Sequence, residues 1–269
     1  MLSKRILTMQ DLSCVGQCSL TVALPVLSAF GVETCVLPTA ILSNHTMFKK
    51  WSCLDLTGEA HNIMSVWEEN SFKFDTFYLG YLGSAPLMDV AKKCFKNFSA
   101  DGAKVIIDPA FGDNGVLYPA FDEKYVAAMK DLIKSADIIL PNLTEACFLS
   151  GIEYEQNASV EFAEKVIKKL SSITSAVIVL TGAEKDGMIG EIIYRNGNFS
   201  YVWAEKLPKR YHGTGDIFAA AFTAEYVQSG SFKKACSVAG ELVAESIKAT
   251  DPSHPYGVNF EYALKNLKK

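Results

Sequence analysis

The sequence has no excess of positive charge. Its 26 lysine and arginine residues are outnumbered by 30 aspartate and glutamate residues, which gives a formal net charge of −4 at pH 7. Nucleic-acid binders normally carry a basic patch or stripe, so that class of protein is disfavoured. With 49% hydrophobic and 21% charged residues, the composition also excludes collagen-like, coiled-coil and disordered proteins. A small-molecule function is the first hypothesis.

The sequence also lacks the cysteine spacings of a disulfide framework or a zinc site. Its seven cysteines are an odd number, and no second Cys/His pair accompanies Cys14 and Cys18. Reduced thiols in a cytoplasmic protein are expected. The first eleven residues hold too few apolar side chains for a signal peptide. Residues 12–32 carry no charge over a length that could span a bilayer, but their polar residues predict a loop and a buried helix, without membrane association.

Three common nucleotide and hydrolase motifs are missing. The chain contains no G-x-x-x-x-G-K-[ST] loop, no complete G-x-G-x-x-G fingerprint and no G-x-S-x-G elbow. P-loop kinases, nicotinamide dehydrogenases and ordinary serine hydrolases are therefore disfavoured.

Short apolar runs alternate with helical patterns along most of the chain. Runs that are apolar at almost every position suit parallel strands covered on both faces. We expect strands at residues 5–9, 33–37, 74–79, 104–107, 138–140 and 176–181, then a hairpin of residues 187–195 and 199–203. Helices close the chain. This order predicts one α/β domain over residues 1–269, with a doubly wound, mostly parallel sheet flanked by helices.

The sharpest local motif is HGTGD at residues 212–216, directly before a helical pattern. Gly213 and Gly215 would let the backbone approach a ligand, and a helix N-terminus presents free N–H groups to an anion. Asp216 would repel a phosphate there unless it takes a proton from the group that attacks the phosphate. The alternative is a helix cap, which stabilises a helix by about 1 kcal/mol without any ligand.

Asn142 and Glu145 form a second candidate, because they follow a short strand at the place where α/β proteins bind ligands. They could hold Mg²⁺ through waters. Their spacing is also that of a capping box, which is the better explanation for this motif taken alone.

Two further segments carry polar side chains that could act in a site. Asp108 ends a predicted strand, where an aspartate often only solvates a turn, and residues 110–118 after it are expected to form a flexible loop. Ser43, Asn44, His45 and Thr46 form a polar cluster. His45 could be a base, or a histidine satisfied by its neighbours.

Taken together, these segments resemble the ribokinase superfamily, and more closely its pyridoxal kinase branch. The resemblance runs from the first strand to the helix after Asp216. It implies that Gly213, Thr214 and Gly215 form an anion hole and that Asp216 is the catalytic base. The family's N-x-x-E magnesium motif matches Asn142 and Glu145.

The resemblance also implies an ATP site. The family's aspartate for ATP phosphate and metal matches Asp108, and its nucleotide-contacting residue falls at Thr181. ATP and Mg²⁺ are the implied cofactors. The residues do not decide whether K⁺ is used as well.

The branch is indicated by SNHT at residues 43–46 and GYLGS at residues 80–84, which resemble vitamin B6 kinases rather than sugar kinases. With these motifs, the cap-only explanations of Asp216 and Glu145 become weaker. Asp11 departs from the serine that pyridoxal kinases usually carry after the first strand. The alternative is that Asp11 faces solvent or pairs with a nearby lysine or arginine. The implied substrate-binding residues are Asp11, Ser43, His45, Thr46, Met47 and Tyr81.

The expected activity is ATP-dependent phosphorylation of the 5′-hydroxyl of pyridoxal, pyridoxine or pyridoxamine by a cytoplasmic homodimer. A hydroxymethylpyrimidine kinase, with the same fold and base, is the nearest alternative. A non-catalytic B6 binder is a third possibility, although it would have no need for a base at the phosphate site.

Overall fold

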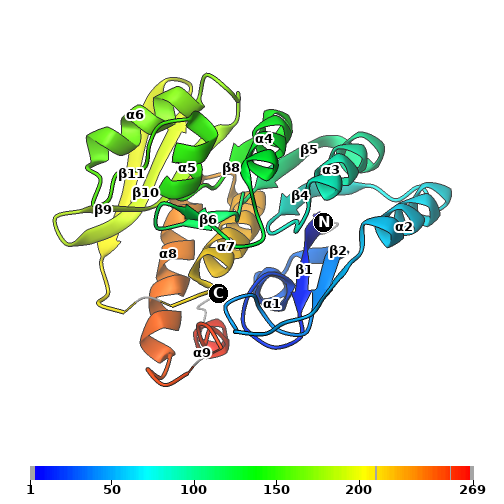
Figure 1. Ribbon diagram of the computed structural model, residues 1–269, viewed down its shortest axis with the longest axis horizontal. Coiled ribbons are helices and arrows are strands. Elements are labelled where there is room, and N and C mark those ends of the chain that lie inside the picture. The colour runs from blue at the N-terminus through cyan, green and yellow to red at the C-terminus, as the bar shows by residue number, and fades with distance from the viewer. Residues whose placement is uncertain (1–3, 210, 255, 267–269) are drawn as a thin grey trace.

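A computed structural model of the chain describes residues 4–209, 211–254 and 256–266. A nine-stranded sheet of order β11-β10-β9-β8-β5-β4-β1-β2-β3 runs through it (Figure 1). The six strands from β9 to β2 are parallel, and antiparallel strands complete both edges. The strands are β1 (Arg5–Ser13), β2 (Glu33–Leu42), β3 (Cys53–Asp55), β4 (Phe74–Leu79), β5 (Ser99–Ile107), β8 (Ile138–Ile139), β9 (Val177–Lys185), β10 (Met188–Arg195) and β11 (Asn198–Glu205).

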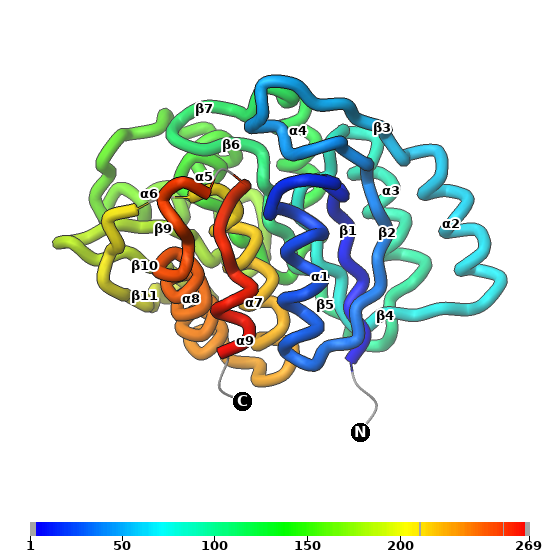
Figure 2. The backbone as a smooth tube through the Cα atoms, turned by 90° about the horizontal axis from the view of Figure 1, so that it is seen from below, coloured from blue at the N-terminus to red at the C-terminus, as the bar shows by residue number. Residues whose placement is uncertain are grey.

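Helices cover both faces of the sheet, and each layer encloses its own hydrophobic core. Figure 2 looks onto the layer of α1 (Leu20–Ala29), α7 (Thr214–Ser229), α8 (Phe232–Ala249) and α9 (Glu261–Lys265). The other layer holds α2 (Thr57–Glu69), α3 (Ala85–Phe98), α4 (Glu123–Leu132), α5 (Leu143–Ser150) and α6 (Val160–Leu170). Because both faces are covered, segments 105–107, 138–139 and 177–180 are apolar at every position, as predicted, whereas β1 also carries buried polar residues.

The predicted strands are present, and the hairpin across Asn196 and Gly197 is confirmed by the antiparallel pairing of β10 with β11. Both turn residues have positive φ, at 51° and 81°, as a tight two-residue hairpin requires. β1 and β2 each extend well beyond the predicted ends, at Ser13 and Leu42. Their additional residues include polar ones, which the apolar pattern could not assign to a strand.

Residues 110–118 form a short hairpin rather than an open loop. Strands β6 (Gly112–Asp113) and β7 (Val116–Leu117) pair with each other. The hairpin is bound to the start of α5, where Thr144 Oγ1 accepts from the Gly115 N–H (2.9 Å). The strand pairing and this hydrogen bond show regular structure where a loop was expected.

The uncharged stretch of residues 12–32 divides between the end of β1, a turn and helix α1. This helix is buried on one face only, with Pro25, Ser28 and Ala29 exposed, so the expectation of a buried helix is correct for half of it. Within residues 4–209, 211–254 and 256–266, no helix combines the length and the apolar character that a membrane crossing requires.

Candidate active site

Four acidic side chains gather at the carboxyl edge of the parallel strands. Asp11 lies in β1, Asp108 follows β5, Glu145 is in α5 and Asp216 is in the first turn of α7. Burial and the charges of Glu145 and Asp216 raise the pKa of Asp108. Burial and the charge of Asp11 raise the pKa of Asp216. No described lysine or arginine forms an ion pair with any of the four. Such a cluster binds protons or an external cation.

The start of α7 is shaped for an anion. Gly213 is its N-cap with φ 84°, and a Cβ there would lie 2.3 Å from the Gln17 carbonyl oxygen, so only glycine fits. The Ile217 N–H bonds to the Gly213 carbonyl, which leaves the amides of Thr214 and Gly215 without a partner inside the helix. A Cβ on Gly215 would meet nothing within 4 Å. A phosphate can approach these amides closely.

Asp216 stands beside these amides and is only partly exposed. Its carboxylate accepts a hydrogen bond from the Ser19 N–H, which favours the ionised form. Burial acts in the opposite direction and raises the pKa of Asp216 to about 6. A carboxylate with a pKa near neutrality can both accept and release a proton under physiological conditions.

The capping box at the start of α5 is present. Glu145 Oε2 accepts from the Asn142 N–H (2.9 Å), and Asn142 Oδ1 accepts from the Glu145 N–H (3.0 Å). The same two side chains also hold the β6 hairpin, because Glu145 Oε1 accepts from the Phe111 N–H and Asn142 Nδ2 donates to the Gly112 carbonyl. Burial raises the pKa of Glu145 to about 8.

Asp108 faces Glu145 in the same buried region. Burial and the charges of Glu145 and Asp216 hold the pKa of Asp108 well above its ordinary value. Thr181 of β9 lies on the same side of the site, because a parallel bridge places it next to Asn142.

The donor set at Asp108 and Glu145 fits magnesium held partly by waters. Among the residues that the structure describes, no three or more His, Cys, Asp or Glu side chains are grouped to enclose an ion. Mg²⁺ keeps several waters and uses one or two carboxylates, so the pair fits it better than it fits a fully protein-ligated metal.

Asp11 is buried on the other side of Asp216, with 3% exposure. Ser13 Oγ donates to its Oδ2 (3.1 Å), and burial raises the pKa of Asp11 while the Ser13 and Ser19 hydroxyls lower it. The alternative of an exposed carboxylate is therefore wrong, and no lysine or arginine that the structure describes pairs with Asp11. The nearby Tyr81 ring packs on Phe121 at 5.1 Å between centroids, and burial with the charge of Asp11 raises the pKa of the Tyr81 phenol.

The SNHT segment forms a loop against the turn after β1. The His45 N–H bonds to the Val15 carbonyl (3.1 Å), and a Cβ on Gly16 would lie 2.1 Å from His45 Cδ2. His45 Nδ1 accepts from the Met47 N–H (3.3 Å), and burial and His212 lower the pKa of His45. His45 is therefore neutral. It contacts the turn after β1, and its ring lies near that of His212.

The remaining residues of this loop lie farther out. Ser43 is exposed and donates to Asn44 Oδ1 (2.8 Å), Thr46 is half-buried, and Met47 is 60% exposed. The position of Met47 thus gives no support to an inward-facing contact.

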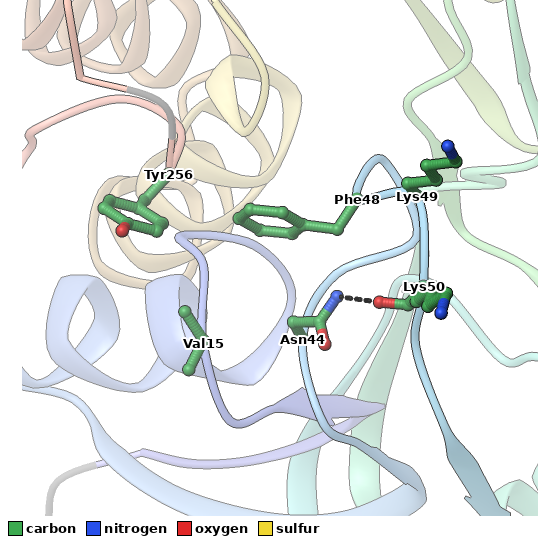
Figure 3. A pocket seen from close by; sticks show the side chains of 6 residues that line it. All are labelled: Val15, Asn44, Phe48, Lys49, Lys50 and Tyr256. Atoms are coloured by element: carbon green, nitrogen blue, oxygen red, sulfur yellow. Dashed lines mark hydrogen bonds between the residues drawn. The ribbon is translucent and has the colours of Figure 1, made fainter.

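A cavity of about 480 Å³ opens between this loop and the chain near residue 256. Figure 3 shows the Phe48 ring directed toward Tyr256, with 5.9 Å between centroids, and Asn44 Nδ2 bonded to the Lys50 carbonyl (3.0 Å). The cavity is lined by Val15, Asn44, Phe48, Lys49, Lys50 and Tyr256.

The turn of residues 14–19 supplies site contacts that the sequence did not reveal. Ser19 donates its N–H to Asp216, and the Gln17 carbonyl packs on Gly213. Cys18 is close enough that burial and the charges of Asp216 and Asp11 raise its pKa to about 12. The sequence did contain one signal for this turn. Gly16 stands in an uncharged stretch directly after a strand, and a glycine there permits close packing of the backbone.

The carboxyl ends of the parallel strands, the free amides at the start of α7 and the adjacent carboxylate form an arrangement that suits a small-molecule phosphotransferase of the α/β class. A family described as phosphomethylpyrimidine kinase matches residues 22–259. The pyridoxal kinase of Lactobacillus plantarum superposes with a TM-score of 0.88 at 32% identity, over 98% of this chain and 96% of that one.

Two further relatives agree. A Bacteroides thetaiotaomicron protein that carries the name of a phosphomethylpyrimidine kinase, in a crystal form with pyridoxal, gives a TM-score of 0.91 at 35% identity, over 98% of this chain and 95% of that one. The Bacillus subtilis pyridoxine kinase is 30% identical over 188 residues, 68% of this chain and 67% of the relative. The chain belongs to the pyridoxal kinase and phosphomethylpyrimidine kinase family of the ribokinase superfamily. The predicted ribokinase-like fold is confirmed.

Proposed function

We propose that the protein transfers the γ-phosphoryl group of ATP to the 5′-hydroxyl of a vitamin B6 vitamer. The observation that carries this proposal is Asp216, a carboxylate with a pKa of about 6 beside the free amides at the start of α7. An anion site alone would not retain an acidic side chain that repels its ligand. A base beside that site serves a hydroxyl that attacks the phosphate.

Asp216 takes the proton of the 5′-hydroxyl as its oxygen attacks the γ-phosphorus, and the bond to the β-phosphate oxygen breaks to release ADP. The amides of Thr214 and Gly215, together with Gly213, stabilise the charge on the transferring group. The Ser19 N–H fixes the carboxylate during this transfer.

ATP is proposed to lie across the carboxyl ends of the strands, with Asp108, Asn142, Glu145 and Thr181 on its side of the cluster. Asp108 and Glu145 would hold Mg²⁺ mainly through waters, and the bound metal would neutralise phosphate charge. Two observations support this assignment: the carboxylates are buried, and no described lysine or arginine forms an ion pair with them.

The vitamer is proposed to lie between Asp11, Tyr81 and the loop that carries Ser43, His45 and Thr46. The pyridoxal in the crystal of the Bacteroides relative, which is 35% identical, supports a vitamer as substrate. A single domain over residues 1–269, a homodimer and a cytoplasmic location belong to the same proposal. The single domain rests on the order of strands and helices, the location on the expected reduced thiols, and the homodimer on the family resemblance.

A second candidate function is phosphorylation of hydroxymethylpyrimidine. It is favoured by the description of the matching family as phosphomethylpyrimidine kinase. Both reactions use the same base and the same fold, so the ring-binding residues decide between them.

The test is ADP release with pyridoxal, pyridoxine, pyridoxamine and hydroxymethylpyrimidine, measured side by side with Mg·ATP. The proposal expects the highest kcat/KM with one of the three vitamers. Preference for hydroxymethylpyrimidine would establish the second candidate. Tight vitamer binding without ADP release would show a binder, and Asp216→Asn is the inactive control for all four substrates.

A further inference from the structure

A polar layer lies inside the core on the α7 side of the sheet. Thr8 in β1 and Tyr78 in β4 are paired neighbours, and both are 0% exposed, as is Gln10. Gln10 Nε2 donates to Thr8 Oγ1 (2.9 Å). Tyr78 otherwise sits among the apolar side chains beneath α1 and α7. Each of these deeply buried polar groups requires a hydrogen-bond partner.

Gln10 is directed along the sheet toward Asp108. Alternate residues of a strand face the same side, so Gln10, Gly80 and Asp108 form the next row beyond Thr8 and Tyr78 on adjacent strands. A Cβ on Gly80 would lie 2.8 Å from both Gln10 Cδ and Oε1. The amide therefore crosses directly over Gly80, where any side chain would displace it.

Neither Gln10 Oε1 nor Tyr78 Oη makes a well-aligned hydrogen bond with a described residue. The Gln10 side chain nevertheless lies close enough to the Tyr78 phenol to lower its pKa through a hydrogen bond. Asp108 and Asp216 lie close enough that their charges, after burial itself, raise the pKa of the Tyr78 phenol. The phenol therefore stays protonated, and its O–H is a donor near two carboxylates.

We propose that Gln10 and Tyr78 are positioning residues that hold one buried water against Asp108, from the side away from the nucleotide. Tyr78 Oη donates to the water, and the water donates one hydrogen to Gln10 Oε1 and the other to the Asp108 carboxylate. This satisfies both orphaned oxygens and gives the water the usual three bonds. The bridge fixes the Asp108 carboxylate for the phosphates and their metal, which is the part of the inference that rests on the proposed function.

The variants Tyr78→Phe and Gln10→Met test the bridge, because each removes the group that would bind the water and nearly preserves volume. Gln10→Met also removes the hydrogen bond to Thr8 Oγ1. We expect each to raise the Kd of Mg·ADP in calorimetry about three- to tenfold, the worth of one neutral hydrogen bond. Since both act through one water, the double variant should be little weaker than either single one. The KM for the vitamer should stay within about twofold, because Asp108 serves the nucleotide side.

Thr223→Val is the matched control. Its hydroxyl is also 0% exposed and without a described partner, on α7 in the same core. This variant should leave the Kd of Mg·ADP unchanged. Equal losses in Thr223→Val and Tyr78→Phe, or unchanged binding in both Tyr78→Phe and Gln10→Met, would overturn the positioning role.

A crystal structure that resolves ordered waters tests the bridge without any substrate. We expect one water within hydrogen-bond distance of Tyr78 Oη, Gln10 Oε1 and Asp108, and its absence would overturn the proposal. Neither that crystal structure nor the measurement of Mg·ADP binding requires a vitamer. A wild-type protein that phosphorylates no vitamer would therefore refute the proposed function while leaving this inference to its own tests.

Discussion

Replacing Asp216 by asparagine should remove catalysis while making the protein more stable. Asparagine keeps the shape of the side chain and can still accept from the Ser19 N–H, but it cannot take a proton. We expect turnover to fall about 10²–10⁴-fold, the usual contribution of a positioned general base. Binding of Mg·ATP should change little.

The gain in stability follows from the raised pKa of Asp216. Burial moves this pKa from 3.8 to about 6, so the folded protein holds the proton more tightly than the unfolded chain does. Stability is therefore highest below pH 4 with respect to this group, and it falls as the pH rises through 6. Two pKa units correspond to about 3 kcal/mol, and solvent contact reduces this, so we expect asparagine to stabilise by about 1–2 kcal/mol at pH 8.

The assay compares thermal unfolding and ADP release for the two proteins between pH 4 and pH 8. At about 2–4 °C per kcal/mol, the variant should melt several degrees higher at pH 8, and the difference should vanish near pH 4. Asp122→Asn is the control, because Asp122 is an ordinary cap that accepts from the Tyr125 N–H (3.0 Å). Near-native turnover in Asp216→Asn, or a melting difference independent of pH, would refute the reasoning.

Three further substitutions test other parts of the site at the carboxyl ends of the strands. Glu145→Gln should raise the Mg²⁺ concentration for half-maximal rate, whereas a pure cap would show only a stability loss of about 1 kcal/mol and an unchanged metal requirement. Gly213→Ala should lower both turnover and melting temperature, because its Cβ would lie 2.3 Å from the Gln17 carbonyl oxygen; unchanged values would contradict the close approach. Asp11→Ser should lower the kcat/KM ratio of pyridoxamine over pyridoxal roughly ten- to a hundredfold if Asp11 binds the amine, and an unchanged ratio would exclude that role.

The sequence was informative wherever structure depends on near neighbours. The apolar runs located β4 and the hairpin closely, since strand periodicity and the Asn196-Gly197 turn are local features. Strand ends were less predictable. β1 continues through Gln10 and Asp11 because tertiary contacts bury these polar side chains, and no apolar pattern marks them.

Contacts between distant segments were beyond local patterns. The hydrogen bond from Ser19 to Asp216 and the packing of Gln17 on Gly213 join residues nearly 200 positions apart. Each motif could be found alone, but the turn after β1 carries no motif of its own. Only the fold shows that this turn contacts Asp216, the proposed base.

The sequence offered two explanations for the acidic residues at helix starts, a cap or a functional group, and the structure shows why they need not exclude each other. Glu145 forms a complete capping box, and its other oxygen accepts from the Phe111 N–H. Those bonds fix a buried carboxylate that would otherwise bend away from Asp108, whose charge opposes it. If Asp108 and Glu145 hold Mg²⁺ as proposed, the capping geometry is thus the means by which two like charges are held close enough to share it. The same reasoning applies to Asp216, whose place in the first turn of α7 would set the proposed base beside the phosphate that the hydroxyl attacks.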